Sequence, residues 1–220
     1  MAGRRPRRPR PKQRVPVVME DVLEKASWMF RTQGYHRTRM QDIAESFGVS
    51  HAALYYHFES KRDILTQLSL RSIEHLLTTA REKVAEPGTP GTRLMSILTA
   101  HADYLVGSTA HVATLVEQET EIPAEDFAII QGLRREYIDM LENLYRMGVR
   151  GGELPDVDPT IATSLLLGAC NWIGRWYEPS QPLGDDQVVA QASTFLSAIL
   201  RSPTSTTTAA EDADSVRSQP

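Results

Sequence analysis

The chain has 220 residues, of which 41% are hydrophobic and 24% charged, with a formal net charge of −4, which is the composition of a globular protein that can bury a full core. Its single cysteine, Cys170, excludes an internal disulfide framework and any multi-cysteine metal site, which fits a reducing cytoplasm. No apolar run can span a bilayer, and none follows the N-terminal arginines as a secretory signal requires, so we expect a cytoplasmic protein with no membrane partner.

Residues 1–15 form a basic arm that we expect to be disordered. Residues 1–19 hold seven Lys or Arg side chains and no acid, so the rest of the chain has 24 − 7 = 17 bases against 28 acids, a net charge of −11. The stretch GRRPRRPRP alternates Arg and Pro, and proline keeps such a chain extended. Arg5 and Arg8 are suited to the negative minor groove of DNA. General attraction to DNA and a solubilising tail are the alternatives.

From residue 16 onward the apolar residues recur at helical spacing almost throughout, and we expect an all-α fold. Gly34 should end the first helix. Thr38 with Gln41, and Ser60 with Asp63, have the spacing of capping boxes at the starts of two later helices. The further helices are expected at residues 60–85, 91–107, 109–119, 123–148, 159–177 and 185–201, followed by a disordered tail at 202–220.

Residues 40–58, MQDIAESFGVSHAALYYHF, have the pattern of two helices joined by a tight turn. Ala44 is small where the second helix must cross closely, Gly48 supplies the left-handed turn, and Ser50 caps the second helix. This is the spacing of a helix-turn-helix, whose second helix enters the major groove of DNA. We therefore predict a three-helix DNA-binding domain over residues 16–65, with a plain helical hairpin as the alternative.

The second helix of this pair is small at its start and aromatic at its end. Residues 50–52 lie at the end of the helix that reaches base edges. The hydrogen-bonding groups of Tyr55, Tyr56 and His57, further along the helix, are suited to phosphate oxygens. Since Tyr55 and Tyr56 point about 100° apart on a helix, one of them should belong to the core. Lys61 and Thr38 begin neighbouring helices, where a phosphate can be held. The expected DNA contacts are Thr38, Ser50, His51, Ala52, Tyr55, Tyr56, His57 and Lys61, with Arg5 and Arg8 from the arm.

The stretch GYHRTRMQDIAESFGVSHAALYYHFESKRDIL resembles the DNA-binding domain of the TetR family of transcriptional repressors. The shared pattern runs from G-Y-x-x-T through D-I-A, G-V-S, L-Y-x-H-F and S-K to a leucine. The resemblance implies a homodimer that places two recognition helices in successive major grooves of a palindromic double-stranded DNA operator. Because the pattern does not fix His51, the operator sequence stays open. Carried over by position, the implied contacts are Thr38, Ser50, His51, Ala52, Tyr55, His57 and Lys61.

Residues 66–201 form the larger rear part, which we expect to bind a ligand and to dimerise. The helix at 159–177 is apolar on nearly all sides, so each of its faces should be buried. The helix at 185–201 carries one cleaner apolar stripe. Paired with their copies from a second subunit, these two helices would make a four-helix dimer interface, with burial inside one monomer as the alternative.

A ligand cavity is expected between the helices at 91–107, 123–148 and 159–177. Aromatic and aliphatic walls with a few polar groups suit a hydrophobic molecule that has a polar or anionic handle. For each residue taken alone, plain core packing is the alternative. The candidate lining residues are His101, Tyr104, Leu105, Tyr137, Met140, Leu141, Asn171, Trp172, Arg175 and Trp176.

The segment NWIGRWYEPSQPL at 171–183 resembles the TetR-type regulators that respond to acyl-CoA thioesters in fatty-acid and steroid catabolism. The resemblance implies an acyl-CoA effector whose acyl part is buried among Trp172, Trp176 and Tyr104. Its phosphates would need bases near the mouth of the cavity. The available arginines are Arg134, Arg135, Arg150 and Arg175.

We expect no enzyme activity, cofactor or metal, since the sequence has no G-x-S-x-G motif, glycine-rich phosphate loop or paired-histidine metal motif. Cys170 lies in an apolar helix and is expected to pack there. The predicted function is a transcriptional repressor released from its operator by a small hydrophobic effector. The alternatives are an architectural DNA-binding protein with no effector, a TetR-type regulator of efflux or other metabolism, and an activator.

Overall fold

The computed structural model describes residues 19–107, 119–177 and 182–201, and within these ranges the chain forms eight α-helices, one short 3₁₀-helix and no strand. The predicted all-α fold is therefore confirmed. None of the described helices is both long and apolar enough to cross a membrane. The arm with Arg5 and Arg8, the helix predicted at 109–119 except for its last residue, and the tail at 202–220 lie outside the described residues.

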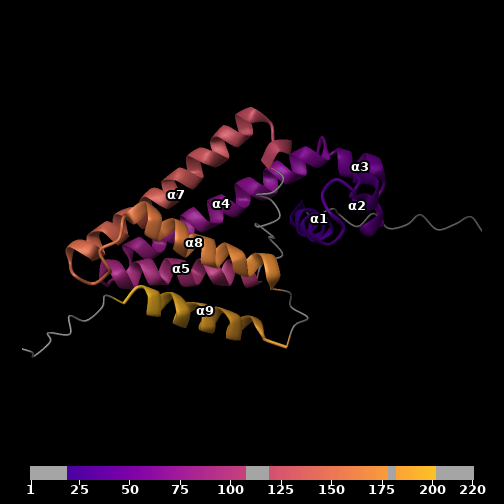
Figure 1. The fold of residues 1–220 in the computed structure, drawn as a ribbon. Coiled ribbons are helices and arrows are strands. Elements are labelled where there is room, and N and C mark those ends of the chain that lie inside the picture. Colours follow the sequence, from indigo (N-terminus) through magenta and orange to yellow (C-terminus); the bar gives the residue numbers. More distant parts are fainter. Residues whose placement is uncertain (1–18, 108–118, 178–181, 202–220) are drawn as a thin grey trace, which may run out of the picture.

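The front module consists of α1 (Met19–Gln33), α2 (Met40–Ser46) and α3 (His51–Tyr55), which lie together at one end of the molecule (Figure 1). Their apolar faces meet in a single cluster of buried side chains. Burying each large side chain of this kind contributes roughly 1.5–3 kcal/mol, which is how three short helices stay packed. The fully buried members include Leu23, Phe30, Ile43, Leu54 and Phe58.

α4 (Lys61–Ala85) connects the front module to the rest of the chain. It begins where predicted, because the Ser60 hydroxyl oxygen accepts a hydrogen bond from the Asp63 backbone N–H at 3.1 Å. Its 25 residues extend about 37 Å at 1.5 Å per residue. Leu65 near its start is buried in the front core, whereas Leu77 is buried in the rear core. A change in the tilt of α4 therefore moves the two ends relative to one another.

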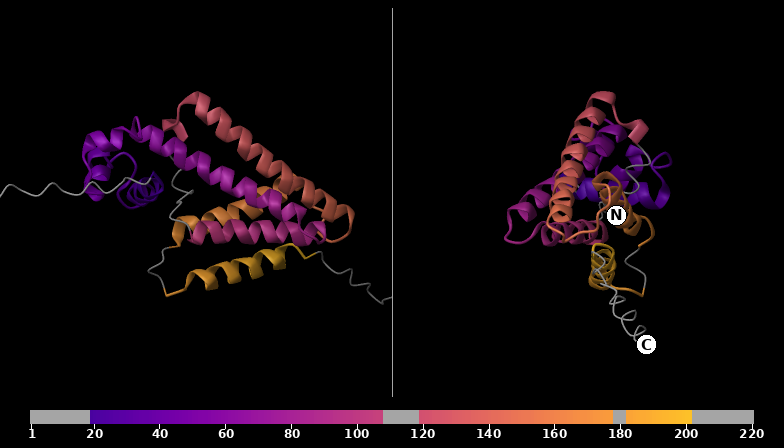
Figure 2. Two further views of the ribbon diagram at one scale, coloured as in Figure 1. Left: turned by 180° about the vertical axis from the view of Figure 1, so that it is seen from behind. Right: turned by 60° about the vertical axis from the view of Figure 1, so that its left-hand side comes forward.

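The rear module contains η1 (Glu119–Glu121), α5 (Pro90–Gly107), α7 (Ala124–Arg150), α8 (Pro159–Trp176) and α9 (Asp185–Ile199), together with the second half of α4. α5 is central and packs against α4, α7, α8 and α9. α9 lies on the side of α5 that faces away from α7 (Figures 1 and 2). α9 is therefore a peripheral helix, supported mainly by α5.

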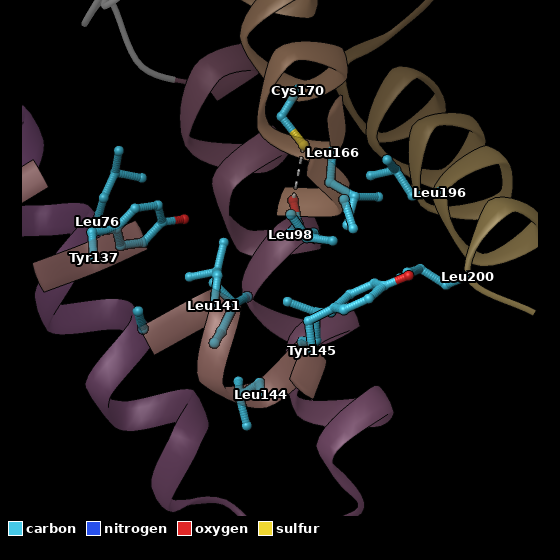
Figure 3. Close-up of a cluster of buried hydrophobic side chains, with 14 of the residues drawn as sticks. Leu76, Leu98, Tyr137, Leu141, Leu144, Tyr145, Leu166, Cys170, Leu196 and Leu200 are labelled. Atoms are coloured by element: carbon cyan, nitrogen blue, oxygen red, sulfur yellow. Dashed lines mark hydrogen bonds between the residues drawn. The ribbon is translucent and has the colours of Figure 1, made fainter. Parts of the chain in front are cut away.

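The rear core is formed by side chains from α4, α5, α7, α8 and α9 (Figure 3). Leu98, Leu141 and Cys170 are fully buried in it. The Cys170 thiol lies 3.8 Å from the backbone carbonyl oxygen of Leu98, and burial raises the pKa of this thiol to about 12. A thiol in this state is a packing group, since the thiolate is the nucleophilic form.

The segment between α1 and α2 differs in part from the prediction. Gly34 ends α1 with φ at +88°, the left-handed conformation that favours glycine. The predicted capping box of Thr38 with Gln41 is wrong by one residue. Arg39 precedes α2, and its backbone N–H donates to the Asp42 carboxylate at 2.8 Å. The register shifts because the Thr38 side chain is buried and already bonded elsewhere.

Candidate functional site

The turn between α2 and α3 has the geometry of a helix-turn-helix. Gly48 has φ at +63°, and the Val49 backbone N–H donates to the Ala44 carbonyl oxygen at 3.1 Å. Ala44 is almost fully buried, so the two helices approach closely at this residue. The Ser50 hydroxyl oxygen accepts a hydrogen bond from the Ala53 backbone N–H at 3.2 Å and so caps α3. Each of these elements agrees with the local prediction.

α3 buries one face and leaves the other open. Leu54 is completely buried, whereas Ser50, His51 and Ala52 at the start of the helix are exposed. The ring of His51 meets the ring of Tyr55 edge-on at 4.6 Å between centroids. The exposed surface of α3 therefore combines small side chains at its N-terminus with an aromatic pair along one side, an arrangement that fits a groove with polar edges.

The expectation that one of the two tyrosines belongs to the core is wrong. Tyr55 is 44% exposed and Tyr56 is 85% exposed. α3 has only five residues, and Leu54 together with the fully buried Phe58 fills the space beneath it. Both hydroxyl groups are therefore available at the surface beside the half-buried His57.

Thr38 and Lys61 are engaged within the protein. The Thr38 hydroxyl donates to the carbonyl oxygen of Gly34 at 3.0 Å, with that of Met29 at 3.4 Å, and its side chain is completely buried. The Lys61 ammonium donates to the carbonyl oxygens of Tyr35 and Thr38 at 2.7 and 3.0 Å and lies 4.2 Å from the centre of the Tyr35 ring. Desolvation lowers the pKa of Lys61, against a smaller raising effect of Glu121.

These contacts differ from the phosphate contacts expected for Thr38 and Lys61. The turn before α2 leaves the carbonyl oxygens of Tyr35 and Thr38 outside any helix, although the first accepts a turn hydrogen bond from the Thr38 N–H at 3.2 Å. The Lys61 ammonium, 26 residues from Tyr35 in the sequence, donates to both of these oxygens. Both residues therefore fix the start of α2 relative to the start of α4. They position the helix-turn-helix from the inside.

The rear module contacts the front core directly. Ile122, just after η1, and Ile130 on α7 are buried in the same cluster as the side chains of α1 to α3. Beside them, Arg62 at the start of α4 forms an ion pair with Glu121 at 3.6 Å. A shift of α7 relative to α4 would therefore change how the rear module packs against the core of the helix-turn-helix.

A buried polar bridge joins three helices of the rear module. His101 on α5 lies 2.8 Å from the Tyr137 hydroxyl on α7 and 3.1 Å from the Asn171 side-chain oxygen on α8. Burial lowers the pKa of His101 to about 4, against a smaller raising effect of Asn171, and burial also raises the pKa of Tyr137. Since the Asn171 oxygen only accepts, the neutral imidazole donates from Nε2 and accepts a hydrogen bond from the Tyr137 hydroxyl at Nδ1.

The other predicted lining residues divide into an inner and an outer group. Leu105 and Leu141 are buried in the rear core, and Met140 packs against it. The Tyr104 hydroxyl donates to the Ser72 hydroxyl oxygen at 3.2 Å, and its ring stacks on His75. The outer group lies on the exposed side of α8 and comprises Trp172, Arg175 and Trp176, with Asn171 exposed but reaching back to His101.

Trp172 and Trp176 lie outside the predicted internal cavity. Trp172 is 61% exposed, and both tryptophans line a surface groove of about 330 Å³ between α8 and α9. At 100° per residue, Leu166, Cys170 and Ile173 take the inner face of α8, which turns the tryptophans outward. One face of α8 is therefore exposed in the single chain, and the expectation that every face is buried applies to the predicted dimer.

Two buried hydroxyl groups on α4 were not among the residues predicted from the sequence. Thr66 and Ser69 are nearly fully buried, and within the described part of the chain their hydroxyl oxygens have no hydrogen-bond partner. Ser72 continues the same face and bonds Tyr104. Their signal in the sequence was three small polar residues spaced three apart on an otherwise apolar helix face. In the same part of the chain, no group of three or more His, Cys, Asp or Glu side chains could hold a metal ion.

Two protein-family models match the chain. The model described as bacterial regulatory proteins, tetR family, covers residues 22–68. The model described as tetracyclin repressor-like, C-terminal domain, covers residues 87–200, which is more than half of the chain. The two matches fall on the front module and on the rear module.

Characterised relatives are similar over most of their length. The chain is 26% identical over 174 residues to the HTH-type transcriptional repressor KstR2 of Mycobacterium tuberculosis, a match that covers 78% of this chain and 86% of that protein. It is 24% identical over 161 residues to the fatty acid metabolism regulator protein of Bacillus subtilis, covering 71% and 81%.

Solved structures have the same arrangement of helices. The TetR family transcriptional regulator PfmR from Thermus thermophilus superimposes with a TM-score of 0.74 at 30% identity, covering 81% of this chain and 96% of that one. AibR, solved in complex with isovaleryl coenzyme A and operator DNA, superimposes with a TM-score of 0.70 at 26% identity, covering 80% and 96%.

Proposed function

Since the chain belongs to the TetR family of bacterial regulatory proteins, we propose that it is a transcriptional repressor that binds a palindromic operator as a homodimer and is released by a small hydrophobic effector. As a member of this family it is a DNA-binding regulator and not an enzyme. The observation that carries the proposal is the open face of α3, held at a fixed angle by the turn at Gly48. Bacterial DNA lies in the cytoplasm, which is where such a protein would act.

The proposed DNA contacts follow the exposed side of α3. Ser50, His51 and Ala52 would meet base edges, because short side chains allow the helix backbone to approach the groove floor. The hydroxyl groups of Tyr55 and Tyr56 would donate to phosphate oxygens, with His57 beside them. Thr38 and Lys61 are given a positioning role because of their internal hydrogen bonds. Arg5 and Arg8 would follow the adjacent minor groove.

The proposed dimer interface is the outer face of α8 and α9. Leu165 is 69% exposed and Phe195 is 62% exposed in the single chain, and Trp172 continues the same apolar surface. A second copy that covers this face would bury it in a four-helix arrangement. The tryptophans would then act at the subunit interface, which is a different role from the lining of a cavity.

We assign the effector to the interior between α4, α5, α7 and α8. Its walls would be Tyr104, Leu105, Met140 and Leu141, and its polar contacts the His101–Tyr137 pair and the unpartnered hydroxyls of α4. An acyl-CoA thioester is the class we propose, supported by likeness to a fatty acid metabolism regulator and to a protein solved with isovaleryl coenzyme A. The phosphates of the thioester would be bound by arginines, for which the proposed residues are Arg134, Arg135, Arg150 and Arg175.

Release would occur by a shift between two arrangements of the helices. An effector that prefers one position of α4 changes the spacing of the two recognition helices in the dimer, which must match successive major grooves. Ile122 and Ile130 are buried in the front core, so a movement of α7 could also shift the recognition helices. A coupling free energy of about 1–3 kcal/mol is typical of such release.

The proposal is tested by selecting genomic fragments that the purified protein binds, sequencing them, and repeating the selection with a mixture of acyl-CoA thioesters. A palindromic motif with half-sites about one helical turn apart would support operator binding by a dimer. Loss of the fragments with this motif when acyl-CoA is added would support release by the effector. Ala52→Glu should abolish capture, and Thr78→Glu, which places the same charge on an exposed position of α4, should not. Recovery of unpatterned DNA would overturn operator binding, and a motif indifferent to every thioester would overturn the effector.

A further inference from the structure

The front module carries a surface groove that the proposed DNA contacts do not use. It has a volume of about 380 Å³ and is lined by Asp21, Glu24, Lys25 and Trp28 of α1 and by Phe47 after α2. The four α1 residues are spaced three, four and seven apart, so they share one face of the helix. The groove therefore combines two exposed carboxylates with an aromatic floor.

The charge and aromatic groups of this groove suit a basic segment. Within the described part of the chain, no ion pair joins Asp21 or Glu24 to a base. The Trp28 side chain is 40% exposed and already accepts one cation, since the Lys25 ammonium lies 4.5 Å from its ring centre. A tryptophan face attracts guanidinium groups more strongly than other aromatic rings do. Aromatic grooves are also a common site for extended proline-rich segments.

The chain itself contains a segment of this chemistry. Residues 4–14 carry seven bases, and Pro6, Pro9 and Pro11 favour an extended polyproline conformation. We propose that residues 4–14 of the same chain dock in the groove of Asp21, Glu24 and Trp28 when the protein is not on DNA. The prolines would lie against Trp28 and Phe47, and the arginines would pair with the carboxylates and with the exposed part of the indole ring.

The length of the arm allows this contact. Trp28 lies nine residues into α1 from Met19, about 14 Å along the helix. Eleven residues of polyproline helix extend about 34 Å, so the arm can turn before α1 and run back along it. Because the arm is tethered to α1, its effective concentration at the groove is on the order of millimolar, and weak contacts are sufficient.

Docking would set a competition between the groove and DNA. An arm held by Asp21 and Glu24 is withheld from phosphates, so binding to random DNA is weakened, whereas a full operator complex supplies enough contacts to draw the arm away. Docking of the arm would occur whatever the effector or the operator sequence. It predicts that the acidic groove lowers DNA affinity only through the arm.

The test is a cycle of four full-length proteins that bind a short duplex of random sequence. Asp21→Asn with Glu24→Gln should tighten binding by roughly 3- to 10-fold, since exposed ion pairs and cation–π contacts are each worth up to about a factor of five. The same pair should have little effect when Arg4, Arg5, Arg7 and Arg8 are all serine. Equal tightening in both backgrounds would mean simple repulsion of DNA by the acids and would overturn the proposal. Glu82→Gln with Asp139→Asn removes two exposed carboxylates outside the groove and is the control for the change in net charge.

A second measurement does not involve DNA. In the nitrogen–proton NMR spectrum the Trp28 indole N–H should shift when the four arginines become serine, while the Trp172 and Trp176 signals stay in place. Trp28→Ala should tighten random-DNA binding as the carboxylate variant does, with Met147→Ala on α7 as the neutral control. An unmoved Trp28 signal would overturn docking even if the protein bound no DNA.

Discussion

The imidazole Nδ1 of His101 on α5 lies 2.8 Å from the hydroxyl oxygen of Tyr137 on α7, inside the rear core. Burial keeps the imidazole neutral, and because its Nε2 donates to the Asn171 oxygen, its Nδ1 accepts a hydrogen bond from the Tyr137 hydroxyl. Two helices that would line the proposed effector site are thereby joined by a polar contact that is sensitive to its surroundings. An effector that competes for either group would change the packing of α5 against α7.

The neutral state of His101 predicts a pH dependence of stability. The unfolded imidazole takes up a proton near pH 6.5, whereas the folded one does so only near pH 4. The unfolded chain therefore binds more protons between these values, and stability falls as the pH is lowered from 6.5 to 4, by up to about 1.4 kcal/mol per pH unit. The free energy of unfolding in urea should differ less between pH 7 and pH 5 for His101→Gln than for the wild type.

Removing the Tyr137 hydroxyl should destabilise the rear module. Tyr137→Phe leaves Nδ1 of His101 buried without a donor, at a cost of about 1–3 kcal/mol in the free energy of unfolding. Tyr145→Phe is the matched control, because the hydrogen bond from the Tyr145 hydroxyl to the Pro155 carbonyl oxygen is part-buried, whereas the Tyr137–His101 contact is fully buried. Chemical denaturation should rank the two variants in this order. An equal loss would mean that the fully buried His101 contact is no more costly to break than a part-buried one.

The variant Lys61→Met tests whether the Lys61 ammonium only positions the helix-turn-helix or also contacts a DNA phosphate. Loss of its hydrogen bonds to the Tyr35 and Thr38 carbonyls should lower stability by about 1–3 kcal/mol and weaken operator binding. The slope of log Kd against log salt should not change, because no DNA contact is lost. A direct phosphate contact would reduce the slope by about 0.9, and that result would support the phosphate contact predicted for Lys61. Lys83→Met at the far end of α4 is the control.

The exposed Tyr56 should matter for DNA and not for folding. Tyr56→Phe should weaken operator binding about 3- to 10-fold, as expected for one hydrogen bond to phosphate, and should leave the unfolding midpoint unchanged. Leu54→Ala on the buried side of α3 should instead cost about 2–5 kcal/mol of stability. Fluorescence anisotropy with a labelled operator, together with thermal unfolding, distinguishes the two. A large loss of stability in Tyr56→Phe would place the ring in the core after all.

The outer face of α8 and α9 should hold the dimer together. Leu165→Glu combined with Phe195→Glu places two charges on an apolar surface that a partner would bury, and should give monomers in light-scattering measurements. Operator affinity should fall with dimerisation, since two half-sites would no longer be bound by one particle. Met147→Glu, on an exposed position of α7, should remain dimeric. Dimers of unchanged stability in the double variant would place the interface elsewhere.

Local chemistry in the sequence determined the helices and the helix-turn-helix. The left-handed turn at Gly48, the cap at Ser50 and the small Ala44 act within a few residues of one another, so their spacing alone specifies the geometry. The same holds for the start of α4 at Ser60, and the register error at Thr38 arose where a buried contact replaced a local one. Helical periodicity likewise identifies the apolar faces of α8 from the sequence, without reference to the helices that pack against it.

Only the tertiary structure decided which neighbour each face meets. Periodicity cannot tell whether an apolar stripe is covered by its own chain or left open, and so Trp172 and Trp176 proved to be outside while His101 proved to be buried. Lys61 carries the same charge wherever it lies, but the carbonyl of Tyr35, 26 residues away, determines what its ammonium binds. Hydrogen bonds between residues distant in sequence depend on the packing of whole helices, and no local pattern encodes them.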